Sequence, residues 1–248
     1  MLKTLVVQSY CEERVSGWIA ICLDSVKSWA SGAGYDYQFL GDELLSKVPS
    51  WYADKVAGRL PIVTDLGRLI WIAELLAERE YDRIVWLDAD TLVFAPDGLR
   101  IDLSETCVFG GESWLQQDKK GHLKVYRNVH NAMMAFKAEC PVLPFLIRTV
   151  KRLISEVDPQ YIAPQMVGPK LLSSLHSLAR FDVDERFGAI SPLLARMIID
   201  GEIPGHKIGR KSGEERRPMR AANLCLSLSE EIPHAQLVPM LLERAEGL

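Results

Sequence analysis

Short apolar runs, each about as long as a β-strand, recur along this chain. They cover Thr4 to Ser9, Tyr35 to Leu40, Cys107 to Gly110 and Asn131 to Phe136, and the second alternates aromatic and polar residues. Runs of this length are typical of strands in a sheet, and continuous apolar runs are typical of buried strands. We therefore expect these four segments to be strands.

Longer segments between and after these runs have helical spacing. From Ile62 to Ala77, apolar residues recur every three or four positions, which gives a helix one apolar face. Further helices are expected over Glu13 to Ala30, Val142 to Glu156, Met166 to Leu178, Leu193 to Asp200 and Ala235 to Ala245. Strands that alternate with helices are typical of an α/β fold with a mostly parallel sheet. Because no repeat, low-complexity tract or linker interrupts it, we expect residues 1–248 to form one domain.

Two segments have no clear period. Gly111 to His130 combines Trp114 with Gln116, Gln117 and a charged cluster, and His206 to Arg220 is rich in Lys and Arg. Long irregular loops in compact domains are often lids or binding loops. We expect both segments to be loops of this kind.

The run from Arg83 to Phe94 differs from the others because it contains two carboxylates, Asp88 and Asp90. An ionised carboxylate buried without a partner is costly, so this pattern predicts a cationic partner. Carboxylates without Cys or an adjacent His suit Mg²⁺ or Mn²⁺ rather than zinc, and phosphate oxygens usually complete such a site. A solvated turn is the alternative for this short motif. The flanking apolar residues instead favour a strand end, which is where ligands bind in α/β sheets.

Composition is that of an ordinary globular protein, with 48% hydrophobic residues and a net charge of −4. This balance gives no general affinity for nucleic acid. The cysteines are scattered, without a Cys-x-x-Cys pair, so we expect reduced thiols and no zinc site. They are Cys11, Cys22, Cys107, Cys140 and Cys225. Without an apolar run long enough for a transmembrane helix or a signal peptide, a cytoplasmic location is expected.

Five short motifs follow one another along the first 175 residues. They are Gln8-Ser9-Tyr10, Thr64-Asp65-Leu66-Gly67-Arg68, Trp86-Leu87-Asp88-Ala89-Asp90-Thr91, Asn131-Ala132-Met133-Met134-Ala135-Phe136-Lys137 and Val167-Gly168-Pro169. Their order resembles glycosyltransferases of the GT-A fold, the nucleotide-diphospho-sugar transferases with a Rossmann-like sheet. The similarity is with the group that carries a DXD sugar-binding motif, which includes capsular-polysaccharide and mannosyltransferase-like enzymes, and more distantly with the glycogenin-like group.

The resemblance implies a metal-dependent hexosyltransferase that acts in polysaccharide biosynthesis. It would move a sugar from a UDP- or GDP-sugar to a hydroxyl of a carbohydrate or glycolipid acceptor, with retention at the anomeric carbon. Asp90 would be the main ligand of Mn²⁺ or Mg²⁺, and Asp88 would reach the metal or the ribose. Gln8, Ser9 and Tyr10 would hold the nucleoside.

The same resemblance implies roles for three residues outside the DXD motif. Asp65 would bind donor-sugar hydroxyls, and Arg68 would pair with Asp65 or with a phosphate. Asn131 would orient the transferred sugar or the acceptor. For Asp65 and Arg68, a surface salt bridge worth under about 1 kcal/mol stays open as the alternative.

The chain departs from the family in its late histidine block. The family has His-x-x-Gly-x-x-Lys-Pro-Trp, whereas this chain has His206-Lys207-Ile208-Gly209-Arg210-Lys211. His206 is thus a candidate third metal ligand, and Lys211 is a candidate for binding the diphosphate. The alternative for both is a solvated loop, and contact of this basic loop with anionic lipid stays open.

The sequence leaves open a possible catalytic base and two alternative functions. Glu112 is the candidate base if the enzyme inverts, although the families resembled mostly retain, which makes it an ordinary loop residue. His130 lies beside Asn131 and is not predicted as a site residue. A phosphohydrolase of the haloacid-dehalogenase type would have Asp-x-Asp-x-Thr near its start, but here Thr91 directly follows Asp90. A non-catalytic nucleotide-sugar-binding protein is disfavoured because both acidic residues are present.

Overall fold

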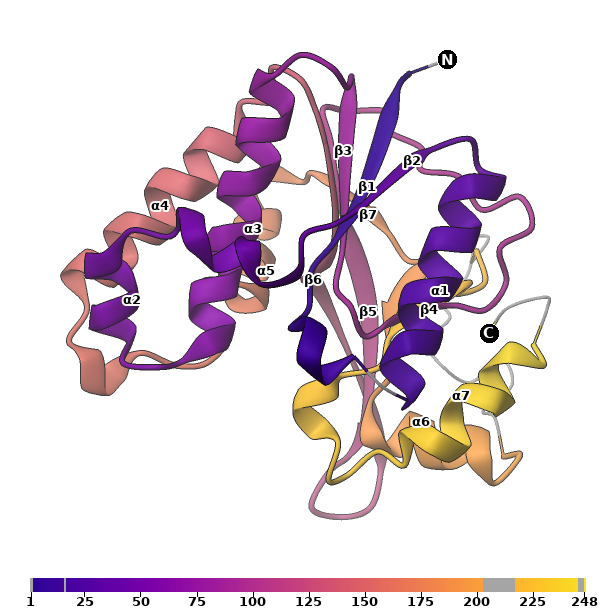
Figure 1. Ribbon diagram of the computed structural model, residues 1–248. Coiled ribbons are helices and arrows are strands. Elements are labelled where there is room, and N and C mark those ends of the chain that lie inside the picture. Colours follow the sequence, from indigo (N-terminus) through magenta and orange to yellow (C-terminus); the bar gives the residue numbers. More distant parts are fainter. Residues whose placement is uncertain (1, 16, 203–216, 245–247) are drawn as a thin grey trace.

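The computed structural model in Figure 1 describes residues 2–15, 17–202, 217–244 and 248. Six strands form a central sheet in the order β2-β1-β3-β6-β5-β7. Their bounds are β1 Thr4–Gln8, β2 Asp36–Phe39, β3 Arg83–Leu87, β5 Cys107–Gln117, β6 Leu123–Lys137 and β7 Asp182–Asp184. Among these described strands only β6 runs against the others, because it pairs antiparallel with both β3 and β5. The predicted α/β fold with a mostly parallel sheet is confirmed.

Strands β1 and β3 are buried along their whole length because helices cover both faces of the sheet. Alternate residues enter opposite cores. Leu5 and Val7 of β1 pack with Ile84 and Trp86 of β3 on one face, and Val6 packs on the other. The near-continuous apolar runs in the sequence follow from this two-sided burial.

The helices form two groups, one on each side of the sheet (Figure 1). One group contains α2 Ser50–Val56, α3 Leu60–Ala77, α4 Val142–Glu156 and α5 Pro169–Ala179. The other contains α1 Gly17–Gly32, α6 Pro192–Ile199 and α7 His234–Leu242. Short 3-10 helices are η1 Glu12–Arg14, η2 Gly41–Lys47, η3 Pro159–Tyr161 and η4 Leu226–Leu228. Among the described helices, none is long and apolar enough to cross a bilayer.

The predicted helices agree with these elements to within a few residues, and α4 has the predicted bounds. The first helix was expected from residue 13, but α1 begins at Gly17. A φ of +51° at Gly17 prevents a right-handed helix from extending back through it. Helix α2 was not predicted.

A second, three-stranded sheet was also not predicted. It has the order β4-β9-β8, with β4 Thr91–Val93, β9 Ala221–Asn223 and β8 Phe187–Ala189. The apolar run from Arg83 to Phe94 is therefore divided between the two sheets, and the Asp-x-Asp motif forms the turn between them. Asp88 follows directly on β3, as the sequence predicts, and its carbonyl accepts a 3.0 Å bond from the Thr91 N–H.

The expectation of a loop over Gly111 to His130 is wrong. Strands β5 and β6 continue there as a hairpin, paired from Gly110–His130 to Gln117–Leu123. The pattern hid these strands because the hairpin is polar on much of both faces and has no apolar run. Asp118 closes its turn by accepting bonds from the N–H groups of Lys120 (2.8 Å) and His122 (3.0 Å). The second expected loop, His206 to Arg220, lies largely outside the described residues.

Phe109 tests the packing where the sheet passes into this hairpin. It is fully buried, and its ring lies 5.6 Å from that of Phe136 and 4.7 Å from that of Phe181. We expect Phe109→Ala to lower the free energy of unfolding by about 3–5 kcal/mol, because it removes a large buried ring. Phe145 on α4 is half exposed, so Phe145→Ala should change the free energy of unfolding by less than about 0.5 kcal/mol. Urea unfolding of both variants measures the difference, and equal losses would contradict the described core.

Candidate active site

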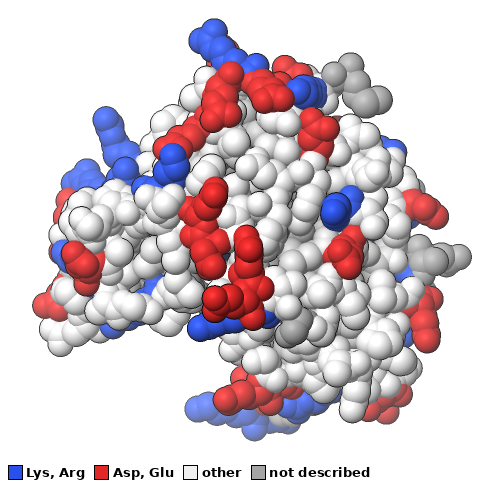
Figure 2. Space-filling model, in the orientation of Figure 1, with Lys and Arg blue, Asp and Glu red and all other residues white. Residues whose placement is uncertain are grey.

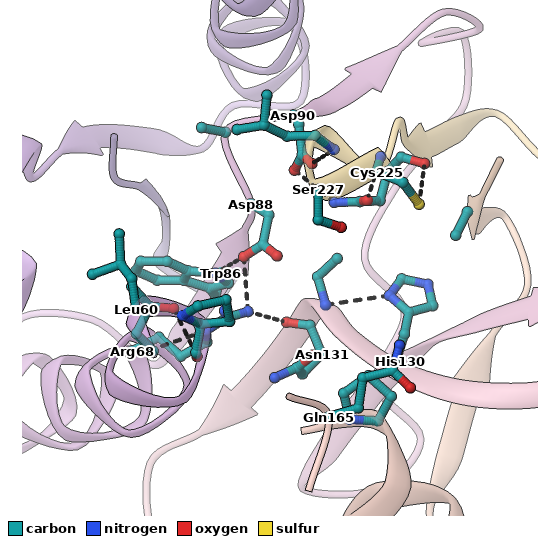
Figure 3. A pocket seen from close by; sticks show the side chains of 18 of the residues that line it. Leu60, Arg68, Trp86, Asp88, Asp90, His130, Asn131, Gln165, Cys225 and Ser227 are labelled. Atoms are coloured by element: carbon teal, nitrogen blue, oxygen red, sulfur yellow. Dashed lines mark hydrogen bonds and ion pairs between the residues drawn. The ribbon is translucent and has the colours of Figure 1, made fainter. Parts of the chain in front are cut away.

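A cleft of about 1160 Å³ opens where β1 and β3 end. Ser9 and Tyr10 line it after β1, Asp88 and Asp90 line it after β3, and residues after β9 close another side (Figure 3). This is the edge at which ligands bind in open α/β sheets. The volume is slightly above the roughly 300–1000 Å³ that is typical of a site for a small ligand.

Three elements meet in a buried network of charged and polar groups beside this cleft. Arg68 of α3 donates from Nη1 to Asp88 Oδ1 (2.8 Å) and to the carbonyl of Asn131 (2.9 Å), while its Nη2 lies 3.0 Å from Asp65 Oδ1. Asn131 of β6 donates from Nδ2 to the same Asp65 oxygen at 2.7 Å. The Asp65 and Arg68 side chains are each only 8% exposed. The alternative of a surface salt bridge is therefore excluded for this pair.

Burial sets the electrostatics of this network. It raises the pKa of Asp65, while the charge of Arg68 and the bond from Asn131 oppose the rise. For Arg68, burial alone lowers the pKa, but Asp88 and Asp65 outweigh it and hold the pKa above its usual value. Among the described residues here, the single positive charge of Arg68 is surrounded by the carboxylates of Asp65, Asp88 and Asp90. The cleft edge therefore attracts a further cation.

The position of Asp88 is fixed from several sides. Trp86 donates from Nε1 to Asp88 Oδ1 at 2.7 Å, and Gln8 donates from Nε2 to the Asp88 carbonyl at 3.1 Å. Gln8 in turn accepts a 3.1 Å bond from the Tyr37 hydroxyl. Figure 3 shows the second carboxylate oxygen of Asp88 pointing into the cleft. Gln8, expected to touch the nucleoside, is fully buried behind Asp88, whereas Ser9 and Tyr10 lie on the cleft wall.

Asp90 is held by a segment more than 130 residues later in the chain. Its Oδ1 accepts a 2.6 Å bond from Asn223 Nδ2, and its Oδ2 accepts a 2.8 Å bond from the Leu226 N–H. Its carbonyl accepts a third bond, from the Leu224 N–H, at 2.8 Å. Burial and then the charge of Asp88 raise the pKa of Asp90 to about 6. Sequence reasoning missed Asn223, because no local pattern links it to the Asp-x-Asp turn.

His130 forms part of the cleft wall, and Gly110 leaves room for its ring. His130 is buried, and its Nδ1 accepts from the Ala132 N–H (3.2 Å), so its Nε2 carries the proton given to the Phe187 carbonyl (3.0 Å). A Cβ at Gly110 would lie 2.3 Å from the His130 ring, so only glycine fits opposite it. His130 was not predicted as a site residue.

Gly168 has a similar role at the start of α5. A Cβ there would lie 2.7 Å from Asp65 Oδ2 and 3.0 Å from Asn131 Nδ2. Glycine thus lets the chain approach the buried network. This explains in physical terms why the predicted Val167-Gly168-Pro169 motif belongs to the same site.

The remaining predicted residues are distributed differently. Asp65 is not among the residues that line the cleft, because Arg68 and Asn131 lie in front of it. His206 and Lys211 lie outside the described residues. Glu112, expected in a loop, is instead on β5, lines the cleft and accepts a 2.9 Å bond from Asn128 Nδ2.

The residues present fit a hard divalent cation. Asp88 and Asp90 offer carboxylate oxygens, the donors that Mg²⁺ and Mn²⁺ prefer. No group of three or more His, Cys, Asp and Glu side chains arranged to bind a metal occurs in the described part of the chain. A metal here would therefore keep positions for phosphate or water oxygens, as Mg²⁺ commonly does.

No family model and no curated protein matches this chain. Among solved structures, a glycosyltransferase involved in glycosylation of the major capsid of PBCV-1 is 11% identical, with a TM-score of 0.49 over 95% of this chain and 99% of that one. A197 from STIV is 13% identical, with a TM-score of 0.30 over 71% and 78% of the two chains.

A mutant of Drosophila β1,4-galactosyltransferase 7, in complex with manganese, UDP-Gal and xylobiose, is 10% identical. Its TM-score is 0.31, over 71% of this chain and 74% of that one. Similarities at this level do not show a shared family or activity.

The raised pKa of Asp90 has a measurable effect on stability. Since the folded state holds this proton more tightly than the unfolded chain, the stabilisation is fully present below about pH 4 and is lost as pH rises through about 6. A shift from 3.8 to about 6 corresponds to about 3 kcal/mol. With EDTA present, the free energy of unfolding of the wild type should therefore fall relative to that of Asp90→Asn as pH rises from 4 to 7. The relative change should be at most about 3 kcal/mol. Urea unfolding at each pH measures the two free energies of unfolding, and a difference that does not change with pH would contradict the raised pKa of Asp90.

Proposed function

We propose that this protein is a metal-dependent glycosyltransferase. It transfers a sugar from a nucleotide-diphosphate donor, a UDP- or GDP-sugar, to a hydroxyl of a carbohydrate or glycolipid acceptor. The observation that supports this most is the pair Asp88 and Asp90 at the strand end in a large cleft, backed by the buried ion network of Arg68. The motifs that resemble GT-A enzymes converge on the same cleft.

Asp88 and Asp90 hold the cation in this proposal. A bound Mg²⁺ or Mn²⁺ would supply positive charge to the departing diphosphate. Arg68 and Trp86 orient Asp88, while Asn223 and the Leu226 N–H orient Asp90. Because such bonds fix both carboxylates before a ligand binds, binding costs little side-chain entropy.

Asn131 is the residue that contacts the transferred sugar. Its Nδ2 donates to Asp65, which leaves the side-chain Oδ1 to accept from a sugar hydroxyl. Asp65 lies behind it and acts as a positioning residue, through Asn131 and Arg68. This modifies the direct sugar contact that the resemblance implies for Asp65.

The stereochemical course is proposed to be retention, as the resemblance implies. Glu112 is nevertheless a carboxylate in the cleft, 2.9 Å from Asn128 Nδ2, and could serve as the base of an inverting enzyme. The anomeric configuration of the first-formed product, followed by proton NMR, distinguishes the two courses. Retention would leave Glu112 outside the chemical step.

Ligand-induced stabilisation tests the proposal. The full chain is heated with Mn²⁺ and each of UDP, GDP, ADP and CDP, as the wild type and as Asp90→Asn. At a hundredfold excess over the dissociation constant, the matching nucleotide should stabilise the wild type by about 2.7 kcal/mol. Asp90→Asn should lose this effect, because it removes one carboxylate that binds the metal.

Asp54→Asn is the matched control, because Asp54 is exposed on α2 and does not line the cleft. It should respond like the wild type. No stabilisation by any nucleotide, or equal stabilisation of the wild type and Asp90→Asn, would refute the proposal. Metal-dependent hydrolysis of p-nitrophenyl phosphate without nucleotide binding would favour the phosphohydrolase instead.

A further inference from the structure

The hairpin of β5 and β6 extends the cleft well beyond the carboxylates. From the Gly110–His130 pair outward, the two strands form an arm that reaches the lower end of the molecule in Figure 1. Alternate residues of this arm line the cleft. They are Glu112, Trp114 and Gln116 from β5, and Tyr126, Asn128 and His130 from β6.

The residues between them face the other side of the hairpin, and that side packs against the protein core. Leu115 and Val125, which pair across the arm, pack into the apolar core formed with α6 and α7. Because successive strand residues point to opposite sides, burying Leu115 commits Trp114 and Tyr126 to the cleft. Tyr126 remains 44% exposed and Trp114 is half-buried. Two aromatic residues thus lie at opposite positions of the two strands, on a face that the protein covers only in part.

The polar neighbours of these rings narrow the ligand class. Glu112 and Asn128 form the next pair inward and are bonded at 2.9 Å, and Gln116 lies on the next β5 position outward. Aromatic faces suit the C–H face of a sugar ring, and carboxylate and amide groups suit its hydroxyls. Glu112, Asn128 and Gln116 keep further hydrogen-bonding groups, which a purely apolar ligand would not use.

We propose that this arm is an acceptor subsite that binds an oligosaccharide, with Trp114 and Tyr126 stacking on its sugar rings. The inference rests on the proposed glycosyl transfer, since Asn131 marks the reactive end of the same cleft. Tyr126 and Asn131 are five residues apart on β6, which is at most about 17 Å at 3.4 Å per residue, and Asn131 lies within a shift in the β5–β6 register. The residues that line the cleft thus continue along the arm beyond Asn131, where further sugar units of an acceptor would lie.

The surface continues beyond Trp114. A second pocket of about 340 Å³ adjoins the cleft and shares Trp114, Gln116 and Leu228 with it. Arg196 and Glu231 line it, which provides both a donor and an acceptor for hydroxyl groups. The ligand surface is therefore elongated, as an oligosaccharide requires. Figure 2 shows Lys and Arg mixed with Asp and Glu over most of the face that it presents.

Stacking of a nucleobase is the competing use of two aromatic rings, and one set of variants separates the two uses. Trp114→Ala and Tyr126→Ala remove the platform. Trp51→Ala, on α2, removes a 43% exposed ring outside the cleft, and Leu123→Ala alters the same arm at a position that does not line the cleft. Circular dichroism confirms that each variant is folded.

Binding is measured by calorimetry on the full chain, with and without Mn²⁺ and UDP or GDP. The probes are linear gluco-, manno- and xylo-oligosaccharides of two to six units. We expect oligosaccharide binding to weaken by about tenfold or more in Trp114→Ala and Tyr126→Ala, and to stay within about twofold in both controls. Nucleotide affinity should stay within about twofold in all four variants, because the platform contacts only the acceptor.

Three results would overturn the inference. They are an unchanged oligosaccharide affinity in Trp114→Ala, a loss of nucleotide affinity in that variant, and an absence of oligosaccharide binding by the wild type. The two proposals fail separately. Oligosaccharide binding through Trp114 without nucleotide binding would refute the transferase and retain the subsite, whereas the reverse result would retain the transferase alone.

Discussion

The guanidinium of Arg68 is the contact on which the rest of the site depends. It joins α3, the end of β3 and the inner part of β6, by bonding to Asp65, Asp88 and the Asn131 carbonyl within 3.0 Å. A buried ion network of this kind contributes little net stability when it is complete, yet it is costly to break. Its value to the protein is therefore positional. It holds the carboxylate of Asp88 at the edge of the cleft, where partial burial would otherwise disfavour a negative charge.

Distant parts of the chain depend on this arrangement. The turn from Asp88 to Asp90 connects the central sheet with the small second sheet, and β9 returns to bind Asp90 through Asn223 and the Leu226 N–H. The two carboxylates are thus held by separate partners, one from the helix side and one from the C-terminal segment. The resulting excess of negative charge is what a divalent cation, and through it a diphosphate, would neutralise. The arm of β5 and β6 continues from the same floor toward an acceptor.

Local patterns in the sequence were sufficient to predict much of this. The two-sided burial of β1 and β3 produces apolar runs, and the i, i+3 spacing of Asp65 and Arg68 on one helix predicts their contact. The position of the Asp-x-Asp motif at a strand end could likewise be predicted, because a charged pair interrupts an apolar run there. The motif that contains Gly168 could be recognised in the sequence. The reason for its glycine, the close approach to Asp65 and Asn131, is known only from the structure.

Other features could not be derived from such patterns. The hairpin arm is polar on much of both faces, so it lacks the alternation that marks a half-buried strand. Asn223 and His130 act through contacts between residues far apart in the chain, for which one sequence carries no signal. The second sheet consists of three-residue strands, too short for any periodicity to be recognised.

The central claim is that Asp88 and Asp90 together bind a divalent metal that carries a nucleotide diphosphate. Anomalous diffraction from crystals grown with Mn²⁺ and the stabilising nucleotide tests it most directly. The predicted result is a manganese peak at bonding distance from oxygens of both carboxylates, with diphosphate oxygens completing its coordination. A nucleotide bound in the cleft with the metal elsewhere, or with no metal beside these two residues, would contradict it.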